Sequence, residues 1–249
     1  MANFVLVHGA WHGGWCWRDV RQTLEENGHR VFTPTLTGLG ERSHLLSHDL
    51  DIETHISDVM NLLVWEELSD VILVGHSYGG MVITGVADRA KDRLHHVVYL
   101  DAFIPVDGQS SATHIVKLLN PNARDEEFAA EINRRLIAGN ALGGSPPDLD
   151  RLFDIPMGMA EKHSWVRRRV TPHPVGTQVT PVHLKNGGAE GLPRTYILCA
   201  GAPRRTPFMV LADRVRHDEG WIYRELDTTH DSMVTMPRET SALLMEAIG

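Results

Sequence analysis

Apolar residues recur along this chain in short blocks that alternate with amphipathic stretches. The two most apolar blocks, residues 4–7 and 71–74, are typical of strands buried on both faces of a sheet. The amphipathic stretches repeat their apolar residues at the spacing of a helix that covers one face of a sheet. Strands are predicted at residues 4–7, 29–34, 71–74, 97–101, 195–200 and 221–226, and helices at residues 15–27, 51–67, 80–91, 208–215 and 239–248.

Strands and helices alternate up to about residue 101, which predicts a parallel, doubly wound α/β sheet of about six strands with helices on both faces. Between residues 104 and 191 the alternation stops. This segment contains a Gly and Pro cluster at 143–147 and a charged helical stretch at 124–137. We therefore predict a single domain over residues 1–249, with residues 104–191 inserted as a cap or lid over the catalytic edge.

A serine lies between two glycines directly after the apolar block at 71–74. The order Gly75-His76-Ser77-Tyr78-Gly79 allows a sharp turn from a strand into a helix, in which a side chain at either glycine would clash. Such a turn forces the serine into a strained backbone conformation and exposes its hydroxyl beside the N-terminus of the next helix. Ser77 is therefore the predicted nucleophile.

Two other strand ends carry candidate chemistry. The Gly-rich loop at residues 8–15 follows the first strand, so its backbone N–H groups can face a ligand and form half of an oxyanion hole. His230 follows the last strand, and it completes the chain order serine, acid, histidine, which is one of the orders found for such catalytic groups. Because a serine hydroxyl needs a base within hydrogen-bonding reach, His230 is the predicted base.

Composition narrows the function further. The chain has 249 residues, 42% of them hydrophobic, and a formal net charge of −8. This charge excludes the basic surface that nucleic acids and anionic membranes attract, so we expect a small-molecule partner. Two cysteines, Cys16 and Cys199, indicate neither a disulfide framework nor a thiolate metal site. No apolar run is long enough for a signal peptide or a membrane span, which predicts a cytoplasmic protein.

These motifs together resemble the α/β-hydrolase fold, and in particular the plant methylesterases and hydroxynitrile lyases with their bacterial relatives. The resemblance covers nearly the whole chain outside residues 104–191. It implies a serine esterase without a cofactor, with Ala10 and Tyr78 as the two backbone oxyanion donors. Among bacterial members it points to hydrolysis of methyl carbamates such as the benzimidazole fungicides. It rests on His8-Gly9-Ala10, Trp15, residues 75–80 and Thr229-His230-Asp231.

The chain departs from this family at the acid. Plant relatives place the acid in the loop after the next-to-last strand, but residues 200–205 contain no carboxylate. Because the base still needs a carboxylate partner, Asp101, at the end of the strand next to the serine, is the predicted acid, with Asp213 and Asp218 as alternatives. The lysine that follows the base in the lyases is replaced by Asp231, which argues against cyanohydrin cleavage.

The remaining predictions concern the pocket and the other histidines. Trp11, Phe103 and Trp165 are predicted to line an aromatic substrate pocket. His163, His173 and His183 recur without carboxylates and are interpreted as surface residues of the cap, so no metal is expected. A ligand-binding protein without turnover, a lyase and a cofactor-free oxygenase on the same fold stay open as alternatives. The sequence leaves open whether the protein is a monomer or a homodimer.

Overall fold

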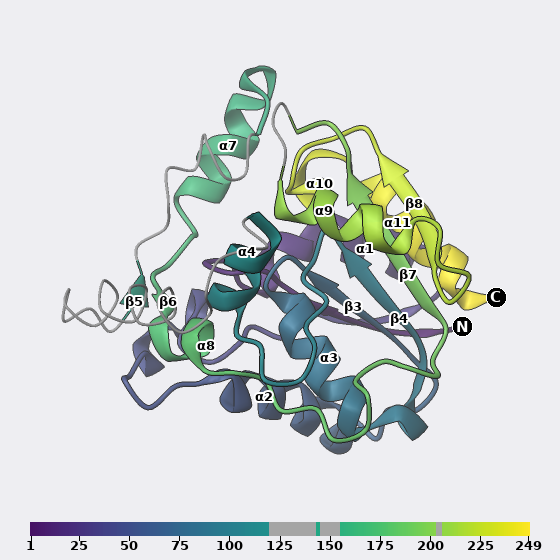
Figure 1. Ribbon diagram of the computed structural model, residues 1–249. Coiled ribbons are helices and arrows are strands. Elements are labelled where there is room, and N and C mark those ends of the chain that lie inside the picture. Colours follow the sequence, from purple (N-terminus) through teal and green to yellow (C-terminus); the bar gives the residue numbers. More distant parts are fainter. Residues whose placement is uncertain (120–142, 145–154, 203–205) are drawn as a thin grey trace.

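Six strands form one parallel sheet at the centre of the molecule (Figure 1). The computed structural model describes residues 1–119, 143–144, 155–202 and 206–249. The strand order is β2-β1-β3-β4-β7-β8, and each neighbouring pair is parallel. The predicted α/β fold is thus confirmed. The strands are β1 (Asn3–Val7), β2 (Arg30–Phe32), β3 (Val71–His76), β4 (Leu94–Leu100), β7 (Arg194–Cys199) and β8 (Ile222–Leu226).

Helices cover both faces of this sheet because successive strand side chains point to opposite sides. In β1, Val5 and Val7 pack into one hydrophobic cluster, whereas Phe4 and Leu6 pack into the other. The first cluster lies under α2 (Ile52–Trp65), α3 (Gly79–Arg89) and α9 (Pro207–Val215). The second lies under α1 (Arg18–Glu26), α10 (Ser232–Thr235) and α11 (Pro237–Met245).

The helix ends follow from local chemistry. Asp51 caps α2 by accepting a hydrogen bond from the Thr54 N–H at 3.0 Å. Gly28, with a φ of 82°, follows α1 and allows the chain to reverse. Some details differ from the sequence prediction: residues 14–17 form a 3₁₀ turn before α1, β4 begins at Leu94 instead of residue 97, and the short helix α10 was not predicted. Further 3₁₀ turns are Gly40–Leu45, Lys91–Arg93, Met157–Met159 and Glu246–Ile248.

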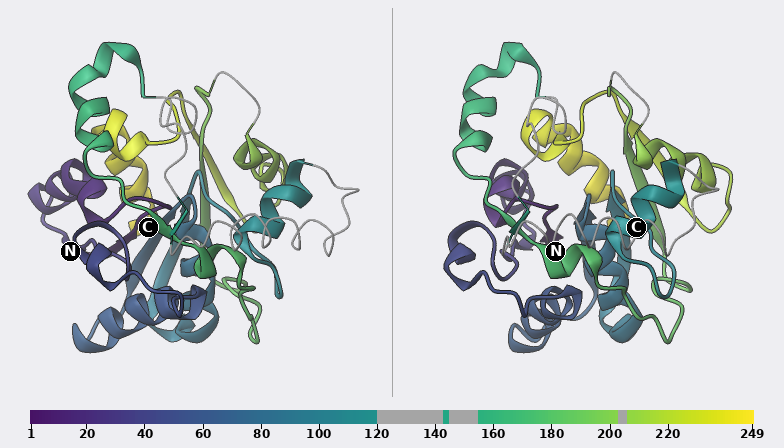
Figure 2. Two further views of the ribbon diagram at one scale, coloured as in Figure 1. Left: turned by 90° about the vertical axis from the view of Figure 1, so that its left-hand side faces the viewer. Right: turned by 60° about the vertical axis from the view of Figure 1, so that its left-hand side comes forward.

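Some described parts of residues 104–191 contact the loops at the carboxyl ends of the strands, whereas residues 185–188 bind the carboxylate of Asp88 in the last turn of α3. Trp165 of α7 contacts Trp15 with ring centroids 5.0 Å apart, and the Trp11 N–H donates to Nδ1 of His173 at 3.3 Å. The views in Figure 2 show α7 standing clear of the sheet. The predicted helix at 124–137 lies outside the described residues. The segment includes α4 (Ser111–Leu119), α7 (Ala160–Arg167) and α8 (Val175–Val179), and β5 (Gly143–Gly144) paired antiparallel with β6 (His173–Pro174).

No helix among the described residues is both long enough and apolar enough to cross a lipid bilayer.

Gly80 marks the closest approach between α3 and the loop that follows β4. A Cβ on Gly80 would lie 2.1 Å from the carbonyl oxygen of Phe103 and 2.8 Å from its nitrogen. Both atoms belong to the backbone, so they cannot move aside as a flexible side chain can. A glycine at this position is therefore required for α3 to pack directly on the sheet.

We expect Gly80→Ala to lower the free energy of unfolding by more than about 2 kcal/mol, because the added methyl group overlaps backbone atoms. The matched control is Gly158→Ala, where a Cβ would meet no atom within 4 Å. The control should change the free energy by less than about 0.5 kcal/mol. Urea unfolding of both variants measures the difference, and equal stabilities would contradict the proposed close packing.

Candidate active site

Ser77 lies at the sharp turn between β3 and α3. Its φ of 53° is in the left-handed region, which a non-glycine residue adopts only at a cost of about 1–2 kcal/mol. The turn is fixed by two backbone hydrogen bonds: Ser77 N–H donates to the Leu100 carbonyl at 3.3 Å, and its own carbonyl accepts from the Phe103 N–H at 3.1 Å. The predicted turn is present, and neighbouring strands hold it in place.

The Gly-rich loop after β1 runs directly beside the serine. A Cβ on Gly9 would lie 2.8 Å from the Cβ of Ser77, and one on Gly79 would lie 2.7 Å from the carbonyl oxygen of Val7. Glycines on both sides therefore allow the two backbones to touch. Ala10 follows Gly9 in this loop and is buried, so its peptide group lies close to the turn that carries Ser77.

His230 and Asp101 form a short, buried hydrogen bond. His230 Nδ1–H donates to Oδ2 of Asp101 at 2.5 Å, and the other carboxylate oxygen accepts from the Cys199 N–H at 3.2 Å. Burial raises the pKa of Asp101, and the hydrogen bond from His230 opposes this rise. Asp213 and Asp218, the other two carboxylates considered, are both exposed. Of these three carboxylates, Asp101 is the one that orients His230.

Two aromatic rings fix the position of the His230 imidazole. Phe208 of α9 stacks on it, with ring centroids 4.7 Å apart and planes at 11°. His76 packs on it at 4.5 Å and donates its Nε2–H to the His230 carbonyl at 3.0 Å. Burial lowers the pKa of His76 well below its usual value, and the neighbouring histidines add to this effect. His76 is thus a neutral donor that binds the backbone of His230 and packs on its ring.

The strands therefore bring three chemically distinct groups to one edge of the sheet. Ser77 follows β3, Asp101 follows β4, and His230 follows β8. A serine on a strained turn and a carboxylate-oriented imidazole at the same strand edge are the groups that nucleophilic catalysis with a general base requires.

Comparison with known proteins identifies the family of the chain. A model of the alpha/beta hydrolase family matches residues 4–243. The chain belongs to the alpha/beta hydrolase family. The family predicted from the sequence motifs is confirmed.

Individual members of the alpha/beta hydrolase family resemble this chain over nearly its full length. The carbendazim hydrolyzing esterase of Nocardioides sp. (strain SG-4G) is 44% identical over 98% of both chains. Methylesterase 10 of Arabidopsis thaliana is 26% identical over 98% of this chain and 90% of its own. An extracellular alpha/beta-hydrolase from a Paenibacillus species, described as sharing structural and functional homology with tobacco salicylic acid binding protein 2, superposes with a TM-score of 0.80 at 25% identity, covering 99% of both chains.

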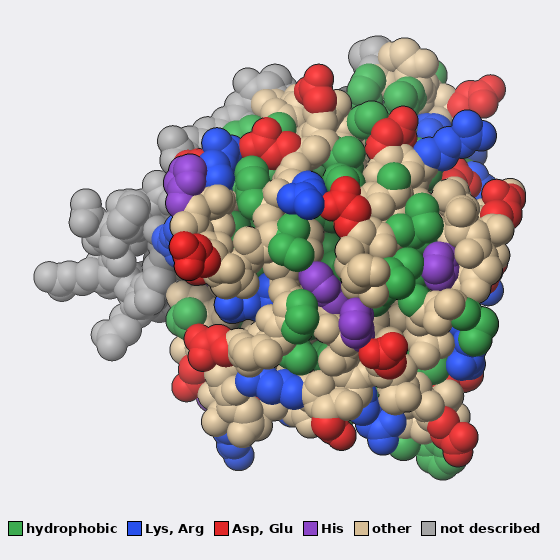
Figure 3. All heavy atoms as spheres, turned by 90° about the vertical axis from the view of Figure 1, so that its right-hand side faces the viewer, with side chains coloured by type: hydrophobic (Ala, Val, Ile, Leu, Met, Phe, Trp, Pro, Cys, Tyr) green, Lys and Arg blue, Asp and Glu red, His purple; other side chains and the backbone are tan. Residues whose placement is uncertain are grey.

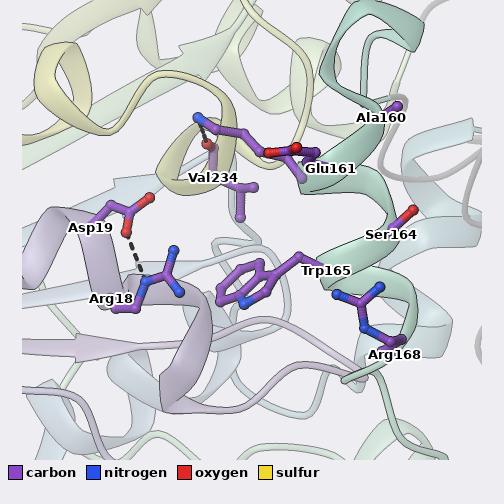
Figure 4. A pocket seen from close by; sticks show the side chains of 9 residues that line it. Arg18, Asp19, Ala160, Glu161, Ser164, Trp165, Arg168 and Val234 are labelled. Carbon is purple, nitrogen blue, oxygen red and sulfur yellow. Dashed lines mark hydrogen bonds and ion pairs between the residues drawn. The ribbon is translucent and has the colours of Figure 1, made fainter.

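The three aromatic residues predicted to line the substrate pocket of this alpha/beta hydrolase lie in different places. Phe103 donates its N–H to Ser77 and packs on Phe208, with ring centroids 5.0 Å apart. Trp11 directly follows Ala10 and has a φ of 63°. Trp165 instead lies over α1, between the guanidinium groups of Arg18 and Arg169. There it borders a groove of about 630 Å³ (Figure 4), and its role in substrate binding stays a prediction.

His173 was interpreted from the sequence as a surface residue of the cap, and this interpretation is wrong. Its side chain is fully buried; its Nδ1 accepts from the Trp11 N–H, and its Nε2–H donates to the hydroxyl of Thr177 at 2.8 Å. The sequence gave no reason to separate His173 from its neighbours His163 and His183, because spacing alone does not report burial. Phe208 was likewise predicted only as a helix residue, although it stacks on the base.

No group of three or more His, Cys, Asp or Glu side chains in the described part of the chain is arranged to hold a metal ion.

Two further buried histidines beside the site are neutral. His8 donates from Nδ1 to the Gly9 carbonyl and accepts at Nε2 from the Leu36 N–H, and burial lowers its pKa to about 3. His55 donates from Nε2 to the Thr37 carbonyl and accepts at Nδ1 from the Tyr78 hydroxyl, and burial lowers its pKa to about 4. Each ring therefore serves as one donor and one acceptor in a fixed tautomer.

We expect His55→Gln to flatten the loss of stability in acid. Between about pH 4 and about 6.5 the unfolded chain binds a proton at His55 that the folded protein excludes, so stability falls as the pH is lowered. Glutamine can make the same two hydrogen bonds without this proton. As the pH is lowered from about 5.5 to about 4.5, the free energy of unfolding of the wild type should fall by roughly 1 kcal/mol per pH unit more than that of the variant. Urea unfolding as a function of pH measures this, and parallel curves in this range would contradict the neutral state of His55.

Proposed function

We propose that this alpha/beta hydrolase is a serine esterase that cleaves a small carboxylic or carbamic methyl ester through an acyl-enzyme. Ser77 is the nucleophile, His230 the general base and Asp101 the acid that orients it. The N–H groups of Ala10 and Tyr78 are the oxyanion donors. The observation that carries this proposal is the buried His230–Asp101 hydrogen bond at the strand edge where Ser77 stands on its strained turn.

The first half of the proposed reaction forms the acyl-enzyme. His230 accepts the Ser77 proton at Nε2 as the serine oxygen attacks the ester carbonyl, and Asp101 stabilises the imidazolium that results. Negative charge develops on the carbonyl oxygen, where the two backbone N–H groups can stabilise it. Breakdown of the tetrahedral intermediate transfers the proton from His230 to the leaving methanol.

The second half repeats these steps with water. His230 removes a proton from water, which attacks the acyl or carbamoyl group and restores the Ser77 hydroxyl. If the substrate is an aryl methyl carbamate, the product is a carbamic acid, which loses carbon dioxide to give the amine. For carbendazim the products are then methanol, carbon dioxide and 2-aminobenzimidazole.

The substrate class is supported by the relatives and by the surface. The Nocardioides esterase, named for carbendazim hydrolysis, shares 44% of its residues with this chain. Lys and Arg side chains are interspersed with Asp and Glu over the face shown in Figure 3, so this face offers no continuous basic track for a nucleic acid. A small, nearly neutral ester or carbamate is therefore the proposed substrate.

Residues 104–191 are proposed to form the cap over this site. Two contacts of the described residues support this role. His173 binds the backbone of Trp11, next to Ala10, and His114 of α4 packs on Phe103 with ring centroids 5.4 Å apart. The insertion thus touches both the predicted oxyanion loop and the loop that follows Asp101.

A binding protein without turnover was an alternative because the acid was missing from its usual loop. The contact between Asp101 and His230 supports turnover instead, because it offers a carboxylate from a neighbouring strand. A lyase remains disfavoured because Asp231 stands in place of the lysine.

We expect the wild type to hydrolyse methyl benzimidazol-2-ylcarbamate, and Ser77→Ala to lower kcat/KM for it by at least about 10³-fold because the nucleophile is lost. The measurement is release of 2-aminobenzimidazole, with p-nitrophenyl acetate assayed in parallel. Turnover of the activated ester alone would retain the serine esterase and exclude the carbamate. Equal rates for wild type and Ser77→Ala would contradict the serine mechanism.

We expect Asp101→Asn to lower kcat by about 10³- to 10⁴-fold, because an amide does not select the productive tautomer of His230 or stabilise its charge. Asp218→Asn, at an exposed carboxylate that accepts from the Gly220 N–H, is the matched control and should keep the wild-type kcat. Steady-state kinetics on whichever ester the wild type cleaves best compares the two variants. A large loss of kcat in Asp218→Asn, with none in Asp101→Asn, would contradict the assignment of Asp101 as the acid.

A further inference from the structure

A second buried histidine–carboxylate pair lies beside the proposed catalytic residues. His12 Nε2 contacts Oδ2 of Asp231 at 3.2 Å, and both side chains are fully buried. Asp231 directly follows the base His230, and His12 lies two residues after Ala10. The pair therefore joins the loop that carries the base to the loop that carries a predicted oxyanion donor.

The hydrogen bonds of His12 show that it carries a positive charge. Its Nδ1 lies 2.8 Å from the carbonyl oxygen of Ala10, and its Nε2 contacts the Asp231 carboxylate. A carbonyl and a carboxylate can only accept, so both ring nitrogens must donate. Burial by itself would lower the pKa of His12, but the charge of Asp231 and its hydrogen bond outweigh burial, and the pKa is raised.

The pair is enclosed by aromatic rings that reach the insertion. Trp15 stacks on His12 with centroids 5.2 Å apart and planes at 29°, and Trp165 of α7 meets the edge of Trp15. Lys162 lies one turn before Trp165 in α7, and its ammonium group donates to the Val234 carbonyl at 2.6 Å (Figure 4). Val234 belongs to α10, which begins directly after Asp231. Helix α7 thus contacts Trp15, which stacks on His12, and Val234, which lies three residues after Asp231.

Asp231 is not a second acid for the base. The Nδ1 of His230 is already bonded to Asp101, and the other oxygen of Asp231 lies 4.0 Å from Nε2 of His76. The direct hydrogen bond of the Asp231 carboxylate is to His12, which in turn binds the Ala10 carbonyl. Its charge also raises the pKa of Asp101, so the test below needs a readout of position besides activity.

Stability alone does not account for a pair of this kind. Removing two charges from water costs several kcal/mol per ion, and well-packed apolar residues of similar size are often as stabilising or more so. A buried pair is better suited to fixing a geometry, because its hydrogen bonds are directional whereas apolar contacts are not.

We propose that the His12–Asp231 ion pair is a positioning device that holds the Ala10 loop in register with the His230 loop. This inference rests on the proposed function, because the two loops need a fixed relative position only if Ala10 is an oxyanion donor and His230 is the base. His12 and Asp231 act through Ala10 and His230 and do not touch the substrate.

The test separates position from stability by comparing Asp231→Leu with the double variant His12→Phe/Asp231→Leu. The single variant leaves a buried imidazolium without its partner, so it should lose both stability and activity. The double variant replaces the pair with apolar groups and should recover the urea midpoint of the wild type. Its kcat for p-nitrophenyl acetate should still be lowered by about 10²-fold, with a smaller change in KM, because the two loops are no longer held together.

Histidine NMR with ¹⁵N labelling supplies a readout that does not require turnover. In the wild type, His12 should show two protonated ring nitrogens. In the double variant, the Nδ1 proton of His230 should exchange with solvent faster than in the wild type. Arg21→Ala/Glu25→Ala, which removes an exposed ion pair on α1, is the matched control and should leave both kcat and this exchange rate unchanged.

The outcomes distinguish the two proposals. A folded double variant with wild-type kcat and wild-type exchange at His230 overturns the positioning role. If the wild type itself hydrolyses no ester, the proposed function fails, and the exchange rate at His230 alone decides the role of the pair. Faster exchange in the double variant then supports it, and unchanged exchange overturns it.

Discussion

The contact between the backbone after β1 and the turn after β3 is the constraint on which the site depends. Gly9 and Gly79 allow two loops to approach so closely that a methyl group on either would overlap the other loop. This approach places the Gly9 backbone against Ser77, one residue before the proposed oxyanion donor Ala10. The parallel sheet makes it possible, since β1 and β3 are neighbours in matched register from Asn3 and Val71 onward and end at the same edge.

Strain is concentrated at this edge. Five non-glycine residues in the described part of the chain have a positive φ, and three of them are Trp11, Ser77 and Asp101. Each directly follows or lies close behind a buried strand, and each is held by hydrogen bonds to a neighbouring loop or strand. The energy that these conformations cost is supplied by the packing of the sheet, which is the usual origin of strain at functional sites.

The sequence predicted well whatever depends on local pattern. The buried strands and the turn at Ser77 each follow from a few adjacent residues, and the parallel order follows from the alternation of elements. Asp101 and His230 could be paired in advance only because both follow strands, so the sheet itself brings them together.

Contacts between distant segments could not be predicted in this way. Nothing near His173 reports that it is buried against Trp11, and nothing near Phe208 reports that it stacks on His230, because both contacts depend on how separate loops pack.

The position of the Asp101 carboxylate, directly after β4, determines how its distance from Ser77 is maintained. Ser77 and Asp101 follow adjacent strands, and the pairing of His76 with Leu100 is the last step of the ladder before them. The separation of nucleophile and carboxylate is therefore set by strand spacing, one of the most rigid dimensions in a protein. The loop after β7, where the plant relatives place the acid, therefore need not supply a carboxylate in this chain. The first residues of this loop still support the chain that leads to His230, because the Gly201 N–H donates to the Thr228 carbonyl at 2.8 Å and a Cβ on Gly201 would lie 2.9 Å from the Thr228 backbone. Gly201 is therefore constrained by the position of His230, although the loop supplies no carboxylate.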